Sequence, residues 1–299
     1  MINLLENCTL CPRNCNVNRL KNKVGFCKGG REVKVARAAL HFWEEPCISG
    51  GKGSGTIFFS NCTLRCVFCQ NNEISQCELG IEISIERLSE IFLELQEKGA
   101  LNINLVTPTH YVPQIIDALK IAKEKGLNLP IIYNSSGYEK VETIKLLKGY
   151  IDVYLPDLKY YNYKYSLKYS KASNYFDFAS KAIDEMVKQV GEVKFNKDGI
   201  IEKGVIVRHL LLPGLLFDSK KILDYLHKTY ENKIYISIMN QYTPLKHVEY
   251  YPEINKKISS KYYETIIDYA VSIGINNGFI QEEGTAKESF IPHFDYEGI

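Results

Sequence analysis

A loop with three closely spaced cysteines constrains this 299-residue chain more than any other feature. Cys62, Cys66 and Cys69 follow a glycine-rich approach and an apolar strand predicted at 56–59, and their spacing is C-x3-C-x2-C. Three thiolates this close can ligate one iron–sulfur cluster. They leave one iron of a 4Fe-4S cluster open, and an open position distinguishes a catalytic metal site from a closed structural one. We therefore predict such a cluster, with a zinc site or a chance group of thiols as the alternative.

A second group of cysteines lies near the start of the chain. Cys8, Cys11, Cys15 and Cys27 read C-x2-C-x3-C-x11-C within a short, loop-rich segment. Four such thiols can form a tetrahedral zinc site or hold a second iron–sulfur cluster. Either group would supply folding free energy that so short a segment lacks. A cluster would favour electron relay to the triad, whereas zinc would favour a structural cap, and the sequence leaves both open.

The composition indicates the compartment in which these thiols act. All nine cysteines fall within the first 77 residues, and the sequence shows no secretory signal and no apolar run of the roughly 20 residues that a membrane span needs. We expect metal ligands in a reducing cytoplasm rather than disulfides, with Cys47 and Cys77 as buried free thiols. The net charge of +2 gives no excess of basic residues of the kind that binds nucleic acid or a membrane surface.

After the cysteine loop, apolar strands alternate with amphipathic helices. Strands are predicted at 56–59, 102–107, 131–133, 151–155, 205–212 and 234–239, helices at 84–98, 112–125, 139–148, 220–230 and 258–273, and a short last strand at 278–281. This alternation predicts an α/β fold with a parallel sheet, a partial (β/α)6 barrel. We expect a cysteine-rich N-terminal extension at 1–49 and the barrel at 50–299, with an insertion at about 160–203.

Polar residues follow each predicted strand, and ligands of such barrels bind at the carboxyl ends of the strands. The segments at these ends include Thr107 and Thr109, Asn134 to Gly137, Asp157 and Lys159, Arg208 and His209, and Gln241 and Tyr242. An inert barrel end would not need so many polar groups. The sequence therefore predicts a binding site built from several strand ends and the cysteine triad.

The triad, with aromatic Phe68 before its last cysteine and a strand before its first, resembles the radical S-adenosylmethionine (SAM) superfamily. The resemblance implies a 4Fe-4S cluster whose open iron binds the amino and carboxylate groups of SAM. It also implies that an electron from the cluster cleaves SAM to a 5'-deoxyadenosyl radical, and that a donor such as flavodoxin or ferredoxin supplies the electron.

Motifs after the strands narrow the resemblance to the pyruvate formate-lyase activating enzyme-like branch, including the uncharacterised iron–sulfur proteins labelled PflX. Asp157-Leu158-Lys159 is similar to the D-L-K of that branch, and Arg208 with Pro213-Gly214 to its R-x4-P-G. Asn134-Ser135-Ser136-Gly137 is similar to its D-T-N-G. The resemblance implies that SAM contacts Phe68, Thr107, Thr109, Asn134, Ser136, Asp157, Lys159 and Arg208.

Two departures from that branch matter. TPTH stands where the activating enzymes carry G-G-E-P, so Thr107, Thr109 and His110 would have to supply the contacts to the SAM amino group. Asn134 replaces an aspartate, which removes an acid from a cation site of the activating enzymes. The cofactor is thus expected to bind in a pose that these residues alter.

The expected function is a radical SAM enzyme that abstracts hydrogen from an unidentified substrate, with His209, Gln241 and Tyr242 as substrate contacts. Activation of a glycyl-radical enzyme is one version, and modification of a peptide or small molecule is another. A non-catalytic iron–sulfur or zinc protein, acting as electron carrier or redox sensor, is the alternative from a different class. A carrier would need only the cysteine loops.

Two further segments have open interpretations. The insertion is long and opens with a run rich in tyrosine and lysine, which suits a partner surface or a helix whose tyrosines pack on the barrel. A hairpin is expected at 192–203. A functional role is open for the Glu44-Glu45-Pro46 turn, although a solvated acidic turn is the favoured interpretation.

Overall fold

The computed structural model describes residues 1–281 and 292–299. The strands are β1 (Val33–His41), β2 (Ser54–Phe59), β3 (Ile81–Ile83), β4 (Ile103–Val106), β5 (Ile131–Ser135), β6 (Val153–Pro156), β7 (Lys194–Phe195), β8 (Ile201–Leu210), β9 (Tyr235–Met239) and β10 (Gly278–Ile280). The α-helices are α1 (Pro46–Ser49), α2 (Asn72–Ser75), α3 (Ile85–Glu97), α4 (Val112–Glu124), α5 (Val141–Leu146), α6 (Tyr163–Ser170), α7 (Tyr175–Val190), α8 (Leu216–Tyr230) and α9 (Ser260–Ser272).

One sheet carries the fold, in the spatial order β10-β9-β8-β6-β5-β4-β2-β1-β3, with β7 paired to β8. The six predicted barrel strands are β2, β4, β5, β6, β8 and β9, and each pairs in parallel with its neighbours among them. β1 and β3 extend the sheet as an antiparallel edge. Within the described residues β10 and β3 end the sheet without meeting, so the prediction of a partial barrel is confirmed.

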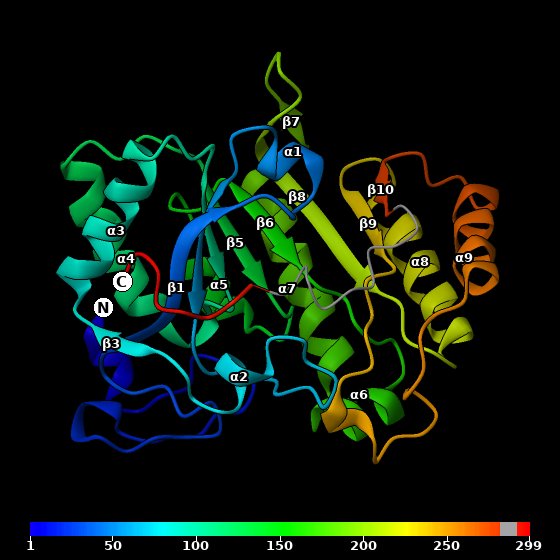
Figure 1. The fold of residues 1–299 in the computed structure, drawn as a ribbon, viewed down its shortest axis with the longest axis horizontal. Helices are drawn as coiled ribbons and strands as arrows, with labels where there is room; N and C mark the ends of the chain where they lie inside the picture. Colours follow the sequence, from blue (N-terminus) through cyan, green and yellow to red (C-terminus); the bar gives the residue numbers. More distant parts are fainter. Residues whose placement is uncertain (282–291) are drawn as a thin grey trace.

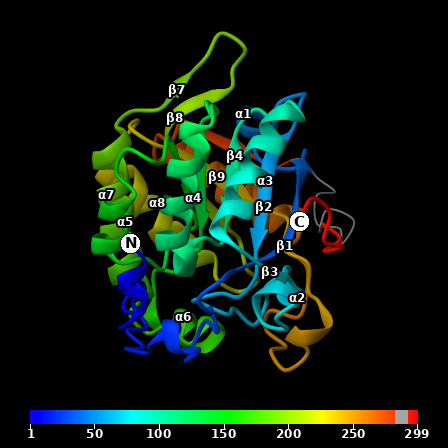
Figure 2. The ribbon, with the colours of Figure 1, turned by 90° about the vertical axis from the view of Figure 1, so that its left-hand side faces the viewer.

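Burial explains why these segments form strands and helices. Every residue of β2, β4, β5 and β6 is buried, as expected for parallel strands covered on both faces. Helix α3 starts where Ser84 accepts a hydrogen bond from the Arg87 amide, and it buries Leu88, Ile91 and Phe92. Figure 2 shows α3, α4, α5, α7 and α8 together on one side of the sheet.

The two ends of the sheet differ. Figure 1 shows the N-terminal segment, α2 and α6 gathered at the end to which β5 and β6 point, and the β7 hairpin at the opposite end. The triad loop, which joins β2 to α2, lies among the first group. The predicted hairpin is present at β7, where Lys194 pairs with Lys203. The carboxyl end of the sheet is thus the end where cysteine-rich segments and strand ends meet.

Residues 292–299 lie along β1. The Ala38 amide donates to the Glu297 carbonyl (2.8 Å), and the Tyr296 amide donates to the Ala36 carbonyl (3.2 Å). Phe294 packs edge-on against Phe58 of β2. The far C-terminal segment therefore covers part of the sheet next to the triad loop.

The insertion folds as α6 and α7. Tyr160, Tyr169 and Tyr175 are buried, whereas Tyr163 is 59% exposed. Of the two interpretations of this segment, packing on the barrel therefore accounts for the three buried tyrosines. Tyr175 ties two strand ends together, because its hydroxyl accepts from the Lys159 amide (3.0 Å) and donates to the Ser136 carbonyl (2.8 Å).

One expectation changes in the structure. Cys47 is buried as predicted, but Cys77 is exposed, because it follows the last turn of the short helix α2 at the surface. The expected boundary at residue 49 falls between β1 and β2, which are hydrogen-bonded neighbours. We propose that the extension proper covers the residues before β1. No helix of the described residues has the length and apolar character required to cross a membrane.

Candidate cluster and cofactor site

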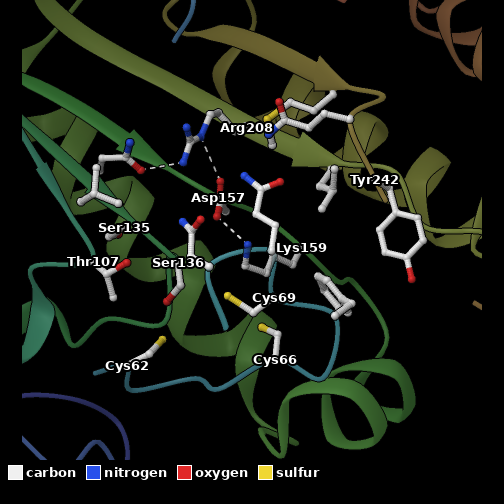
Figure 3. A pocket seen from close by; sticks show the side chains of 18 of the residues that line it. Cys62, Cys66, Cys69, Thr107, Ser135, Ser136, Asp157, Lys159, Arg208 and Tyr242 are labelled. Atoms are coloured by element: carbon white, nitrogen blue, oxygen red, sulfur yellow. Dashed lines mark hydrogen bonds and ion pairs between the residues drawn. The ribbon is translucent and has the colours of Figure 1, made fainter. Parts of the chain in front are cut away.

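The triad loop opens into a cavity of about 240 Å³ at the carboxyl end of the sheet. Cys62, Cys66 and Cys69 all line this cavity, and Figure 3 shows Cys66 and Cys69 side by side below Lys159. Cys62 and Cys66 are buried and Cys69 is partly buried. The three thiols therefore face one shared space.

Each thiol of the triad accepts a hydrogen bond from a nearby donor. The donors are the Leu64 amide to Cys62 Sγ (3.3 Å), the Ser170 hydroxyl to Cys66 Sγ (3.0 Å) and the Ser75 hydroxyl to Cys69 Sγ (3.4 Å). Donors aimed at sulfur are what tune and orient the thiolates of a metal site. The setting of the triad therefore suits metal-bound thiolates.

Burial also favours a bound metal over free thiolates. It raises the pKa of the Cys66 thiol to about 12, although Lys159 acts to lower it, and it raises the pKa of Cys69. Deprotonating these thiols is costly unless a metal binds them, since a coordinated thiol is deprotonated outright. No three His, Cys, Asp or Glu side chains of the described chain form a ready site for one metal ion. The fit to a cluster therefore rests on the donors and their burial.

A chain of ion pairs crosses the wall of the cavity. Asp157, just after β6, accepts from Lys159 Nζ (2.5 Å) and from Arg208 Nε of β8 (3.0 Å), as Figure 3 shows. Burial alone would raise the pKa of Asp157, but its two cationic partners outweigh burial and hold the pKa below its ordinary value. Asp157 therefore stays ionised and fixes both cations at the cavity.

Glu44 completes this network, and sequence reasoning missed it. Its carboxylate accepts from Arg208 Nη1 (3.1 Å), Asn134 Nδ2 (3.2 Å) and Asn104 Nδ2 (3.0 Å). The interpretation of this turn as solvated is wrong, since Glu44 lines the cavity and Glu45 is buried. A turn with two acids gives no sign that the fold brings it onto the sheet. The sequence did hold one signal of a missing acid. Lys159 and Arg208 lie at the ends of predicted strands, and Asp157 is the single acid named beside them.

Thr107 and Ser136 lie where the resemblance expected cofactor contacts. Both line the cavity, as do Ser135 and Asn134, and Figure 3 shows Thr107, Ser135 and Ser136 close together. Thr107 has a φ of +60°, which costs energy for a β-branched residue, and its amide donates to the Asn134 carbonyl (2.9 Å). Such strain is typical of residues whose backbone serves a site.

Not every expected residue reaches the cavity. Thr109 lies in a buried turn and donates to Glu139 Oε1 (2.6 Å), and it does not line the cavity. His209 also does not line it, because Leu158 and Ser219 occupy its two ring nitrogens at 2.7 and 2.9 Å. Phe68, Gln241 and Tyr242 do line the cavity. The Tyr242 hydroxyl is already used by the Ile254 carbonyl (2.8 Å).

The N-terminal cysteines lie apart from the triad. Burial raises the pKa of the Cys11 thiol, and charge on Cys27, Cys8 or Cys15 would raise it further. Burial likewise raises the pKa of Cys27, to about 11. Within the described residues, none of the four lines the cavity. The structure thus keeps the two cysteine groups distinct.

The sequence of this chain is similar to that of known proteins. Residues 56–226 match the family described as the radical SAM superfamily, which is more than half of the chain. An uncharacterised protein of Methanocaldococcus jannaschii is 32% identical over 278 residues, covering 90% of this chain and 75% of that protein. A pyruvate formate-lyase-activating enzyme of Clostridium pasteurianum is 28% identical over 193 residues, covering 61% of this chain and 71% of that enzyme.

Solved structures share the fold. Streptococcus suis SuiB bound to its precursor peptide SuiA matches with a TM-score of 0.51 and 20% identity, over 74% of this chain and 46% of that one. SuiB bound to S-adenosylmethionine matches with a TM-score of 0.50 and 19% identity, over 75% and 49% of the two chains. The chain thus spans just under half the length of that solved protein, and the likeness at this identity is one of fold.

Proposed function

This chain belongs to the radical SAM superfamily, and from that premise we propose that it is an enzyme that uses SAM and a 4Fe-4S cluster to abstract hydrogen from a substrate. The observation that carries the proposal is that the triad and the charged strand ends line the same cavity. A catalytic metal site needs both an open ligand position and groups that hold the ligand.

The residues present fit the two cofactors. Cys62, Cys66 and Cys69 would hold the cluster, with sulfur-directed donors already in place. Lys159 and Arg208 would bind the carboxylate end of SAM as fixed cations, and Thr107 and Ser136 supply hydroxyls beside them. When bound, the pair supplies the electron and the 5'-deoxyadenosyl radical that abstracts hydrogen.

The chain itself positions and encloses the reacting groups. Asp157 and Glu44 hold Arg208 from two sides, so the guanidinium needs little reorganisation when an anionic group arrives. Asn134 Oδ1 accepts from Arg208 Nη2 (2.6 Å), which ties the end of β5 to the same group. Thr109, expected at SAM, would act only indirectly, through buried Glu139.

The substrate would occupy the part of the cavity near β9. Gln241 and Tyr242 line it there, and Phe68 packs edge-on against the Tyr242 ring at 6.1 Å. Because the Tyr242 hydroxyl already donates to a carbonyl, its ring face is the available surface. His209 is not retained as a substrate contact.

Two versions of the reaction remain within the class. SuiB is solved with a precursor peptide, which supports a peptide or protein segment as substrate here. The similarity to a pyruvate formate-lyase-activating enzyme supports activation of a partner protein. In either version an electron donor such as flavodoxin or ferredoxin would reduce the cluster.

The test is the formation of 5'-deoxyadenosine. Protein reconstituted with iron and sulfide without oxygen is incubated with SAM and dithionite, with Cys66→Ala as the control. We expect product with the wild type and background with the variant. Equal product from both would contradict the proposal and favour a non-catalytic electron carrier, in which the cysteines serve electron transfer alone.

A further inference from the structure

The N-terminal segment contains a buried cation, Arg19. Arg19 is 1% exposed, and in the part of the chain described here no carboxylate lies within ion-pair distance of it. Its guanidinium donates to the carbonyls of Gly30 (2.6 Å) and His110 (2.6 Å), and Nη1 lies 3.9 Å from Cys8 Sγ. Because arginine stays protonated, a buried guanidinium needs a counter-charge nearby.

The cysteine sulfurs are the groups that can provide this charge. Besides the contact between Arg19 and Cys8, the Phe26 amide donates to Cys15 Sγ (3.3 Å) and the Gly29 amide donates to Cys27 Sγ (3.4 Å). Backbone amides that donate to sulfur are typical of the surroundings of metal-bound cysteines. Four thiolates around zinc or an iron–sulfur cluster keep a net negative charge, which would balance Arg19.

Gly25 shows how closely the backbone surrounds one of these sulfurs. A Cβ atom at this position would lie 2.6 Å from Cys15 Sγ, which is too close for any side chain. The glycine therefore lets the chain fold back over the sulfur, so that the next amide can donate to it.

A second arginine joins this segment to the triad loop. Arg13, between Cys11 and Cys15 in sequence, donates from Nε to the Thr63 carbonyl (3.0 Å) and from Nη2 to the Ser170 carbonyl (3.0 Å). Thr63 lies within the triad loop, and the Ser170 hydroxyl donates to Cys66 Sγ. Its guanidinium also stacks 3.8 Å above the Phe26 ring, next to Cys27. One side chain thus touches the surroundings of both cysteine groups.

We propose that the four N-terminal cysteines hold a thiophilic metal centre as thiolates, that Arg19 is its buried counter-cation, and that Arg13 couples it to the triad loop. The centre is zinc or an iron–sulfur cluster, because both take four thiolates. The coupling rests on the cluster proposed for the triad, whereas the N-terminal centre stands without it.

Metal content tests the centre in the full chain. Wild-type protein is reconstituted with iron, sulfide and zinc, and compared with a triple variant in which Cys62, Cys66 and Cys69 are alanine. We expect the triple variant to keep about one zinc, or about four irons with sulfide, because its N-terminal cysteines are intact. A triple variant that holds neither overturns the centre. Adding Cys8→Ser and Cys27→Ser to it should release that metal, whereas Cys77→Ser should not, and equal release from both also overturns the centre.

Release of iron from the triad tests the coupling. Arg13→Gln removes the guanidinium, and Arg31→Gln is the matched control, since Arg31 is exposed and pairs only with Glu32 among the described residues. We expect a chelator to remove triad iron about tenfold faster from Arg13→Gln, since partners of metal ligands have effects of this size. The N-terminal metal should stay. Equal rates for the two variants overturn the coupling. Absence of 5'-deoxyadenosine in a fully metal-loaded protein would instead count against the proposed function alone.

Discussion

The two cysteine groups of this chain are joined through Arg13 but lie in different settings. The N-terminal group has four thiols, main-chain amides that donate to its sulfurs, and a buried arginine beside Cys8. The triad has three thiols, and its open side faces a cavity lined by Lys159 and Arg208. Arg13 donates to the triad loop from within the first group.

In each group, the surroundings match the number of cysteine ligands. Four thiols complete the coordination of zinc or of a cubane, so no cavity is needed beside them. Three thiols leave a position free, and the chain places polar groups where a further ligand would enter. The settings thus support the two proposals made above, a closed metal centre in one segment and an open, reactive one in the other.

The largest expected effect separates the two roles. Cys66→Ala should lower 5'-deoxyadenosine formation by more than about 100-fold, since even the partners of metal ligands change activity by roughly 10–100-fold. The N-terminal metal of this variant should be unchanged. Product formation by anaerobic chromatography and metal per chain are the measurements. The contrast fails if Cys66→Ala loses both metals while Cys77→Ala, an exposed control, loses neither.

A change in the cavity wall should affect the open site alone. Arg208→Met removes the cation that Glu44 and Asp157 share. Breaking a buried ion pair from one side costs about 3–5 kcal/mol, so the free energy of unfolding should fall by that order and SAM binding should weaken. Denaturant unfolding and equilibrium binding measure the two effects. Unchanged SAM affinity would remove Arg208 from the proposed site.

A surface charge provides the control for that change. Lys188 pairs with Asp184 one turn away on α7, and its side chain is 66% exposed. Lys188→Met should leave the unfolding free energy close to that of the wild type, because exposed ion pairs contribute little to stability. SAM binding and the metal of both centres should stay as in the wild type.

The arrangement of the barrel was predictable from the sequence because each strand is a short apolar run between helix signals. The approximate position of the cavity was predictable too, because parallel strands end at one edge of the sheet. Asp157, Lys159 and Arg208 therefore meet as expected. Strand order fixes such neighbours before any side-chain detail is known.

Residues outside that rule were not predictable. Glu44 reaches Arg208 from the turn after the antiparallel strand β1, and nothing local in the sequence links the two. Thr109 lies two residues beyond Thr107, yet a 3-10 turn at Thr109–Tyr111 carries it away from the cavity. Such positions depend on one or two backbone dihedral angles, which residue type does not determine.

The buried acid Glu139 gives a pH test of moderate size. Burial raises the pKa of Glu139 to about 7, despite hydrogen bonds from Thr109, Ser135 and Tyr133 that lower it. Its ordinary value is near 4.3, so its folded form prefers the protonated state. Stability from this group is complete below about pH 4 and is lost as pH rises through about 7.

Glu139→Gln should therefore flatten this part of the stability curve. At pH 8 we expect the variant to gain up to about 2–3 kcal/mol relative to the wild type, and at pH 4 to gain nothing. Urea unfolding at the two pH values measures this. The metal at both centres should not change, because Glu139 touches neither group of cysteines. A gain that is equal at both pH values would contradict the raised pKa.

The smallest expected effect concerns a hydrogen bond where the two regions meet. Ser170 donates through Oγ to Cys66 Sγ (3.0 Å), and its carbonyl accepts from Arg13 (3.0 Å). Ser170→Ala removes the first bond and keeps the second, because only the hydroxyl is lost. Hydrogen bonds to the sulfurs help set the reduction potential of a cluster, so the potential of the triad cluster should become more negative. Redox titration followed by electron paramagnetic resonance measures it, with Ser180→Ala, on the exposed side of α7, as the control. If Ser170→Ala leaves the potential where Ser180→Ala does, the hydroxyl does not tune the triad and the link between the regions runs through the Arg13 carbonyl contacts alone.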